Sequence, residues 1–166
     1  MKIFKNIFLV CCALFLLQSC VVSSKPNIEF FSKSNYDSDD AKFASFNVPL
    51  FLAKPYIKKA LREDGENEAA IAMVKKVSKI KMMTVANGSE KMLKDYANYL
   101  KENNYEDWAT IKHEGDNVNI QVKQKGEMIK NMLITVNSKK EMVFLDVKGS
   151  FTADDISKMI NFASDK

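Results

Sequence analysis

Apolar residues recur along this chain with two different periods, which separate strands from helices. Between Val118 and Gln124, apolar and polar residues alternate strictly, which is typical of a strand with one buried face. Between Ser89 and Asn103, apolar residues recur every three to four positions, and Ser89 can cap the start. The first segment therefore predicts a strand and the second a helix.

The other segments follow the same criteria, with turn residues between them. We predict further strands at 42–48, 80–85, 105–113, 129–136 and 142–148, and further helices at 49–62, 67–77 and 156–163. Pro55 either kinks the 49–62 helix or marks its true start, because proline lacks the N–H that a helix interior uses. Thr152 and Asp155 have the spacing of a capping box before the last helix.

The order of these elements predicts an α+β fold. The last four strands are consecutive and joined by short turns, which implies antiparallel pairing. Strands 129–136 and 142–148 are apolar on both faces and should lie centrally, covered by helices. We expect an antiparallel sheet of about four to six strands, with helices packed mainly on one face.

An apolar segment near the start, Ile7–Leu17, follows Lys2 and Lys5 and has the layout of a secretory signal peptide. It is too short for a membrane span, which needs roughly 20 apolar residues. The next residues complete a Leu-Gln-Ser-Cys sequence that resembles the cleavage site of bacterial lipoproteins, in which the cysteine is lipidated and becomes the first mature residue. We expect lipidation at Cys20; an ordinary secretory signal and an uncleaved anchor are the alternatives.

These assignments divide the chain into three parts. Residues 1–19 are the predicted signal peptide, residues 20–40 the lipidated cysteine with a flexible tether, and residues 41–166 a single α+β domain of unknown function. The tether follows from a polar composition without a period. Phe30 and Phe31 are the exception, because they could dock on the domain or start a short strand.

Composition counts against several classes of function. Loss of the two signal lysines lowers the formal net charge from +4 to +2, whereas a nucleic-acid-binding protein needs a concentrated basic surface. The three cysteines, Cys11, Cys12 and Cys20, lie in or beside the signal, and His113 is the single histidine. We therefore expect no disulfide, no metal site, no cofactor and no nucleic-acid partner, and a mature domain that rests on its hydrophobic core.

Several segments together resemble a known family. They are the lipoprotein-type signal, the helical stretch Tyr96–Leu100, the strand Val118–Val122, and the ending Val143–Phe151 before Asp154–Ile156. Over about residues 41–163, this order is similar to that of small Bacteroidota-type lipoproteins with a domain of unknown function, the family numbered 4252. The resemblance implies export and a small α+β domain, and it implies no activity.

Candidate chemical residues have structural explanations beside the functional ones. Asp154 and Asp155 are adjacent, so on a helix they point about 100° apart, and a position in the first turn explains both. His113 has no histidine or cysteine partner, and the chain has no nucleophile elbow or phosphate-binding glycine loop. We predict no catalytic residues.

Aromatic and methionine side chains are the candidates for binding. Tyr99, Tyr105 and Trp108 could form an interaction surface, because aromatic residues dominate interface hot spots, or they could pack between helix and sheet. Four methionines could line an apolar groove or fill gaps in the core, namely Met82, Met83, Met128 and Met132.

The expected function is that of a membrane-anchored envelope lipoprotein with a non-enzymatic binding domain. Its partners would be membrane lipid, through acylated Cys20, and another protein of the envelope. In some of the lipoproteins that this signal resembles, an acidic cluster after the cysteine directs the protein to the cell surface. No such cluster follows Cys20, so the resemblance favours an outer-membrane location facing the periplasm. The alternatives are a carrier or sensor of a small apolar ligand and, less favoured, a hydrolase.

Overall fold

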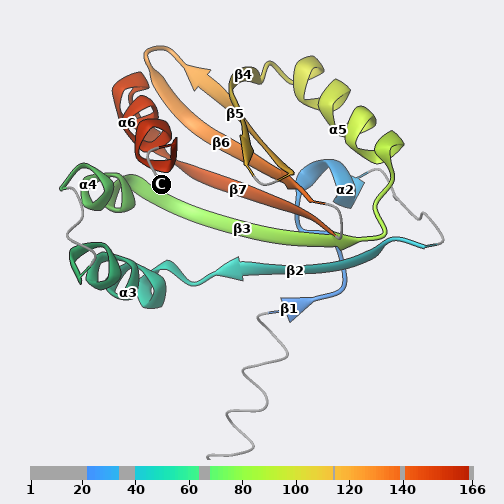
Figure 1. The fold of residues 1–166 in the computed structure, drawn as a ribbon, viewed down its shortest axis with the longest axis horizontal. Coiled ribbons are helices and arrows are strands. Elements are labelled where there is room, and N and C mark those ends of the chain that lie inside the picture. The colour runs from blue at the N-terminus through green and yellow to red at the C-terminus, as the bar shows by residue number, and fades with distance from the viewer. Residues whose placement is uncertain (1–21, 34–39, 64–67, 114, 139–140, 165–166) are drawn as a thin grey trace, which may run out of the picture.

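The computed structural model describes residues 22–33, 40–63, 68–113, 115–138 and 141–164. Within these residues, seven strands form one sheet in the order β1-β2-β3-β7-β6-β5-β4, and each neighbouring pair is antiparallel (Figure 1). The strands are β1 (Val22–Ser23), β2 (Lys42–Val48), β3 (Val77–Ala86), β4 (Glu106–His113), β5 (Asp116–Lys125), β6 (Met128–Asn137) and β7 (Glu141–Phe151). This confirms the α+β class and the four consecutive C-terminal strands, with somewhat more strands than the four to six expected.

The helices lie against both faces of the sheet. They are α2 (Glu29–Lys33), α3 (Leu50–Glu63), α4 (Glu68–Lys76), α5 (Glu90–Glu102) and α6 (Ala153–Ser164). Successive residues of a strand point to opposite faces, and Met132 and Leu133 of β6 accordingly belong to two separate cores. Leu133 packs with residues of α2 and α5, on what we call the α5 face. Met132 packs with residues of α4 and α6, on the α6 face.

This distribution differs from the expected one, in which helices pack mainly on one face. The physical reason lies in the central strands β6 and β7, which are apolar on both faces and need cover on both. The two groups of helices are also displaced along the strands. In Figure 1, α3, α4 and α6 lie toward the left end of the sheet, and α2 and α5 lie toward the right.

Helix α5 forms as its sequence predicts. The Ser89 hydroxyl oxygen accepts a hydrogen bond of 3.1 Å from the backbone N–H of Met92, so Ser89 is the N-cap. Met92, Tyr96 and Leu100 recur every four residues, and all three are buried against the sheet. The helix ends just before Asn104, whose positive φ of 58° leaves the helical path.

Residues 22–33 are part of the folded domain, which corrects the tether expected over residues 20–40. Strand β1 pairs with β2, and α2 buries Phe30 and Phe31 in the core of the α5 face. The docking alternative for these two phenylalanines is therefore the correct one. The polar composition around them was misleading, because Ile28 is buried in the same core and adds to the apolar side that docks this short helix. Of the other tether residues, 20, 21 and 34–39 lie outside the described residues.

The docked helix α2 completes an aromatic cluster. The ring centroid of Phe31 lies 4.9 Å from that of Phe144 on β7 and 5.4 Å from that of Tyr96 on α5. Tyr96 in turn meets Phe144 edge to face at 5.1 Å. Because aromatic pairs in these geometries add stability beyond their buried area, the cluster ties α2, α5 and the central strand together.

Helix α3 begins at Leu50 and contains Pro55, so Pro55 does not mark the start of the helix. Lys54, one residue earlier, donates a hydrogen bond of 2.6 Å from its ammonium group to the backbone carbonyl of Val77. This bond joins α3 to the point at which α4 ends and β3 begins. Within the described part of the chain, no helix is both long enough and apolar enough to cross a membrane.

Candidate functional site

The α6 face carries an apolar surface that the helices leave partly exposed. Six residues on β2, β3, β6 and β7 point to this face in two adjacent register rows, and each keeps part of its surface accessible. We call them the open strip: Phe46, Met82, Leu145 and Ile134 in one row, and Val143 and Val136 in the next. Because contiguous apolar patches on a protein surface mark interaction sites when they are large, the open strip is a candidate binding surface.

The position of the helices explains why this strip is open. Helices α4 and α6 contribute Met73 and Ile156 to a core that includes Val147 and Phe151, in the second half of β7. Leu145 and Val143 precede these residues along the strand. The strip therefore extends beyond α4 and α6, toward the end of the sheet that carries α2 and α5 on its opposite face (Figure 1).

The methionines do not assemble into one groove. Met83 is buried in the core of the α5 face and Met132 in that of the α6 face. Met128 is half-buried at the start of β6. Met82 lies on the open strip, so only one of the four candidates contributes to this surface.

Tyr99 and Tyr105 lie on a different face from Trp108. The two tyrosines pack against the core of the α5 face, and Trp108 packs against the core of the α6 face. Tyr105 also lies beneath a cation, because the Lys123 ammonium group is 5.3 Å from its ring centroid. The structure thus brings together two of the three residues predicted to form an interaction surface and separates the third.

Burial determines the protonation of the tyrosines near α5. Desolvation raises the pKa of Tyr105 to about 12, and the negative charge of Asp146 adds to this effect. Desolvation likewise raises the pKa of Tyr96 and of Tyr99 above the ordinary tyrosine value. These hydroxyl groups therefore keep their protons at neutral pH and can donate hydrogen bonds, but they cannot act as bases.

A small polar group is embedded in the α5 face beside these rings. Asp146 on β7 is buried, and its carboxylate accepts a hydrogen bond of 2.8 Å from the Asn131 side-chain amide on β6. The Asn131 and Gln121 side-chain carbonyl oxygens are buried without a hydrogen-bond partner within the described residues. Because an unpaired buried acceptor costs roughly 1–3 kcal/mol, this group is a candidate site for a hydrogen-bond donor.

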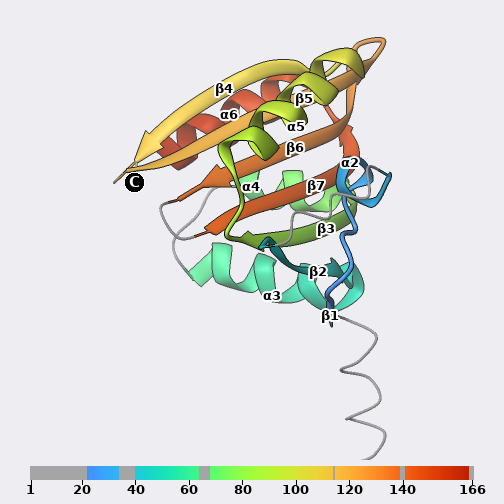
Figure 2. The same ribbon diagram turned by 90° about the vertical axis from the view of Figure 1, so that its right-hand side faces the viewer.

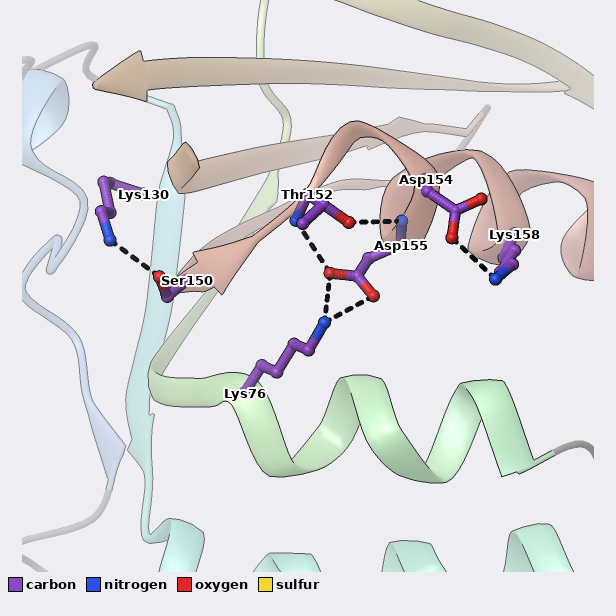
Figure 3. Close-up of polar contacts among 7 residues, drawn as sticks. All are labelled: Lys76, Lys130, Ser150, Thr152, Asp154, Asp155 and Lys158. Atoms are coloured by element: carbon purple, nitrogen blue, oxygen red, sulfur yellow. Dashed lines mark hydrogen bonds and ion pairs between the residues drawn. The ribbon is translucent and has the colours of Figure 1, made fainter. Parts of the chain in front are cut away.

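The two aspartates at the start of α6 have separate structural partners. Asp155 accepts a hydrogen bond of 2.8 Å from the Thr152 backbone N–H, and the Thr152 hydroxyl oxygen accepts one of 3.2 Å from the Asp155 backbone N–H (Figure 3). These two bonds are the predicted capping box. Asp155 also forms an ion pair of 2.6 Å with Lys76 of α4, whereas Asp154 forms one of 2.7 Å with Lys158.

Figure 3 shows that the two carboxylates do not converge on a shared site. Burial alone would raise the pKa of Asp155, but the hydrogen bonds from Lys76 and Thr152 outweigh it and hold that pKa below its usual value. Asp155 therefore remains ionised at neutral pH and joins α6 to α4. Nearby, the Lys130 ammonium group donates a hydrogen bond of 2.7 Å to the Ser150 hydroxyl, which links β6 to the end of β7.

The remaining candidate, His113, ends β4, where its backbone pairs with that of Asp116. Its side chain lies outside the part of the structure that is described. Within the described ranges, no three histidine, cysteine, aspartate or glutamate residues are grouped so that they could hold a metal ion.

Comparison with known proteins places the chain in a family. The model of a domain of unknown function, DUF4252, matches residues 36–159. The chain belongs to the DUF4252 family. No curated protein and no solved structure matches the chain.

The DUF4252 match spans β2 to most of α6, and it excludes β1 and α2. These two elements nevertheless pack on the matched domain, β1 against β2 and α2 in the aromatic cluster. The folded unit of this chain is therefore longer at its N-terminal end than the DUF4252 match. The open strip lies entirely within the match.

Sequence reasoning did not find the open strip. The two central strands were predicted to be covered by helices, whereas the structure covers the α6 face of β7 only over its second half. One signal was available in the sequence. Several predicted strands have apolar residues on both faces, and the three or four short helices predicted with them cannot cover all of that surface. The separation of Tyr105 from Trp108 also had a signal, because residues three positions apart along an extended chain point to opposite faces.

Proposed function

We propose that this DUF4252 protein is a lipid-anchored lipoprotein of the cell envelope whose domain binds another envelope component without catalysis. Cys20 would carry the anchor, and the domain would face the periplasm from the outer membrane. The lipoprotein-type signal ending at Cys20 supports the anchor. The open strip is the observation that supports the binding role.

The open strip suits the binding of a protein with an apolar surface. Its residues are held by backbone hydrogen bonds of four neighbouring strands, so the surface is rigid and its binding requires little ordering. Each apolar side chain that a partner covers contributes roughly 25 cal/mol for each Å² removed from water. A partner helix or sheet with its own apolar face would complete the cover that α4 and α6 give to one end of this face only.

A single lysine at the centre of the strip is sufficient to test this role. Leu145→Lys places a charge among apolar neighbours, while the lysine stem can still pack and its ammonium group can extend to water. We expect the intact lipoprotein to co-purify a partner from membranes and Leu145→Lys to lose that partner by about tenfold or more. The matched control is Asn98→Lys on the exposed side of α5, which should keep the partner.

An unchanged set of co-purifying proteins with Leu145→Lys would contradict the binding role of the strip. Thermal unfolding of both variants, followed by circular dichroism, verifies that each is folded.

Binding of a small apolar ligand is the second candidate function, because the same strip could cover a flat apolar molecule. Organic extraction of the purified protein distinguishes the two, since a carrier would release a stoichiometric apolar compound and a protein-binding domain would not.

A further inference from the structure

The most exposed large apolar side chains of the described residues gather along one edge of the domain. Phe51 is 78% exposed, Tyr56 is 75% exposed and Leu52 is 52% exposed, and all three belong to α3. Val22 of β1 is 58% exposed. Strand β1 and helix α3 both lie along the lower edge of the molecule in Figures 1 and 2. We call these four residues the edge patch.

Leu52 and Tyr56 of the edge patch face outward because the opposite side of α3 is fixed to the domain. The hydrogen bond from the Lys54 ammonium group to the Val77 carbonyl holds that side against the start of β3. Leu52 and Tyr56 are four residues apart and share one side of the helix, turned away from Lys54. Lys58 and Lys59 follow on the next turn.

The chain direction places this edge next to the expected lipid anchor. Two peptide units separate Cys20 from Val22, and they can span about 7 Å at most. Strand β1 is antiparallel to β2. Followed backward, from Ser23 to Val22, the chain therefore runs parallel to β2, toward the end of β2 at Val48. Helix α3 begins two residues after Val48, at Leu50. An acyl chain on Cys20 would therefore enter a membrane on the side of the domain that carries α3.

We propose that the edge patch lies in the membrane interface, with the exposed side of α3 against the lipid surface. This inference rests on the lipid anchor proposed above and adds the orientation of the domain on the bilayer. Interfacial aromatic side chains such as that of Tyr56 partition to the headgroup level, and Leu52 on the same side of α3 can enter the apolar boundary. The anchor and α3 together form two points of attachment, which restrict rotation of the domain.

Fluorescence quenching in vesicles tests this orientation with the full-length, acylated protein. Tyr56→Trp is made in a Trp108→Phe background, so that the chain contains one tryptophan. The protein is reconstituted into vesicles of phosphatidylethanolamine and phosphatidylglycerol, with and without bromine on the acyl chains. We expect the brominated lipid to reduce the emission of this tryptophan about twofold or more, because an interfacial helix buries its apolar side roughly 5–10 Å into the boundary.

The matched control is Asn98→Trp in the same background, on the exposed side of α5, where we expect no quenching. Flotation of the vesicles separates failure of the anchor from failure of the orientation. Protein that floats with the vesicles while its Tyr56→Trp emission is as unaffected as that of the control overturns the interfacial position of α3 and leaves the anchor intact. Protein that does not float overturns the anchor, and the inference is overturned with it.

A second measurement uses the rate at which the protein transfers from labelled donor vesicles to acceptor vesicles. Phe51→Ser removes one apolar side chain from the patch and should raise the transfer rate about tenfold, because burial of a phenylalanine contributes at least that factor to partitioning. Asn98→Ser is the control and should leave the rate unchanged. Equal rates for the two variants would contradict a contribution of the patch to membrane binding.

Discussion

Phe31 is the residue at which the structure departs furthest from the predicted tether. It lies in a segment of polar residues, yet it is 1% exposed and contacts the rings of Phe144 and Tyr96. Removing such a side chain leaves a cavity between α2, α5 and the sheet, because the surrounding structure relaxes only in part.

We predict that Phe31→Ala destabilises the protein by about 3–5 kcal/mol, as is usual for a buried phenylalanine. Chemical denaturation followed by circular dichroism gives the free energy of unfolding. The control is Phe51→Ala, which removes the same atoms from a side chain that is 78% exposed and should cost less than about 0.5 kcal/mol. Equal stability of the two variants would mean that α2 does not belong to the core.

The start of α6 is the element in which local sequence and tertiary structure agree most closely. Thr152 and Asp155 form the capping box that their spacing predicts, and Asp155 adds an ion pair with Lys76 that the sequence alone does not reveal. The folded-state pKa of Asp155 is below its unfolded value, so its ionised form is favoured by folding.

We predict that Asp155→Asn lowers the free energy of unfolding at pH 7 by about 0.5–1 kcal/mol, through loss of the ion pair and of a carboxylate in the first helical turn. The stabilisation by Asp155 is fully present above its unfolded pKa, near the usual value of 3.8, and is lost as pH falls through the lower folded-state pKa. The difference between variant and parent should therefore shrink in denaturation series taken below about pH 4.

Asp154→Asn is the matched control at the neighbouring position. Its ion pair with Lys158 joins two exposed side chains, so we expect little change in stability at any pH. If the two substitutions had the same effect, the link between α6 and α4 through Asp155 and Lys76 would not contribute to stability.

The elements that the sequence predicted well are those determined by local rules. Helix α5 has a capping serine and a regular apolar side, and β5 alternates strictly, so neither depends on distant contacts. Helix α2 and strand β1 depend on surfaces formed by β2, α5 and β7, which are remote in sequence. Their positions follow only once the sheet is assembled.

The same distinction applies to the candidate site. Each residue of the open strip has an ordinary strand pattern, and the strip exists only because register aligns β2, β3, β7 and β6. Which helices cover which end of a face is likewise a property of the assembled domain. Sequence patterns therefore identified the central strands but not the part of them that stays accessible.

For the whole molecule, the two proposals assign neighbouring surfaces to different tasks, since Val22 of the edge patch is the register partner of Phe46 of the open strip. The edge patch on β1 and α3 would orient the domain on the bilayer, and the open strip on the α6 face would bind a partner. Both surfaces lie on one folded unit that includes β1, so a partner bound at the strip would be held at a defined distance from the membrane. The location in the envelope and the orientation on the bilayer both depend on attachment of the chain to lipid through Cys20.

Mass spectrometry of the N-terminal peptide, taken from protein extracted from membranes, tests this attachment most directly. We predict that the mature chain begins at Cys20 and that the cysteine carries covalently bound acyl chains. A mature chain that begins at another residue, or an unmodified Cys20, would contradict the account.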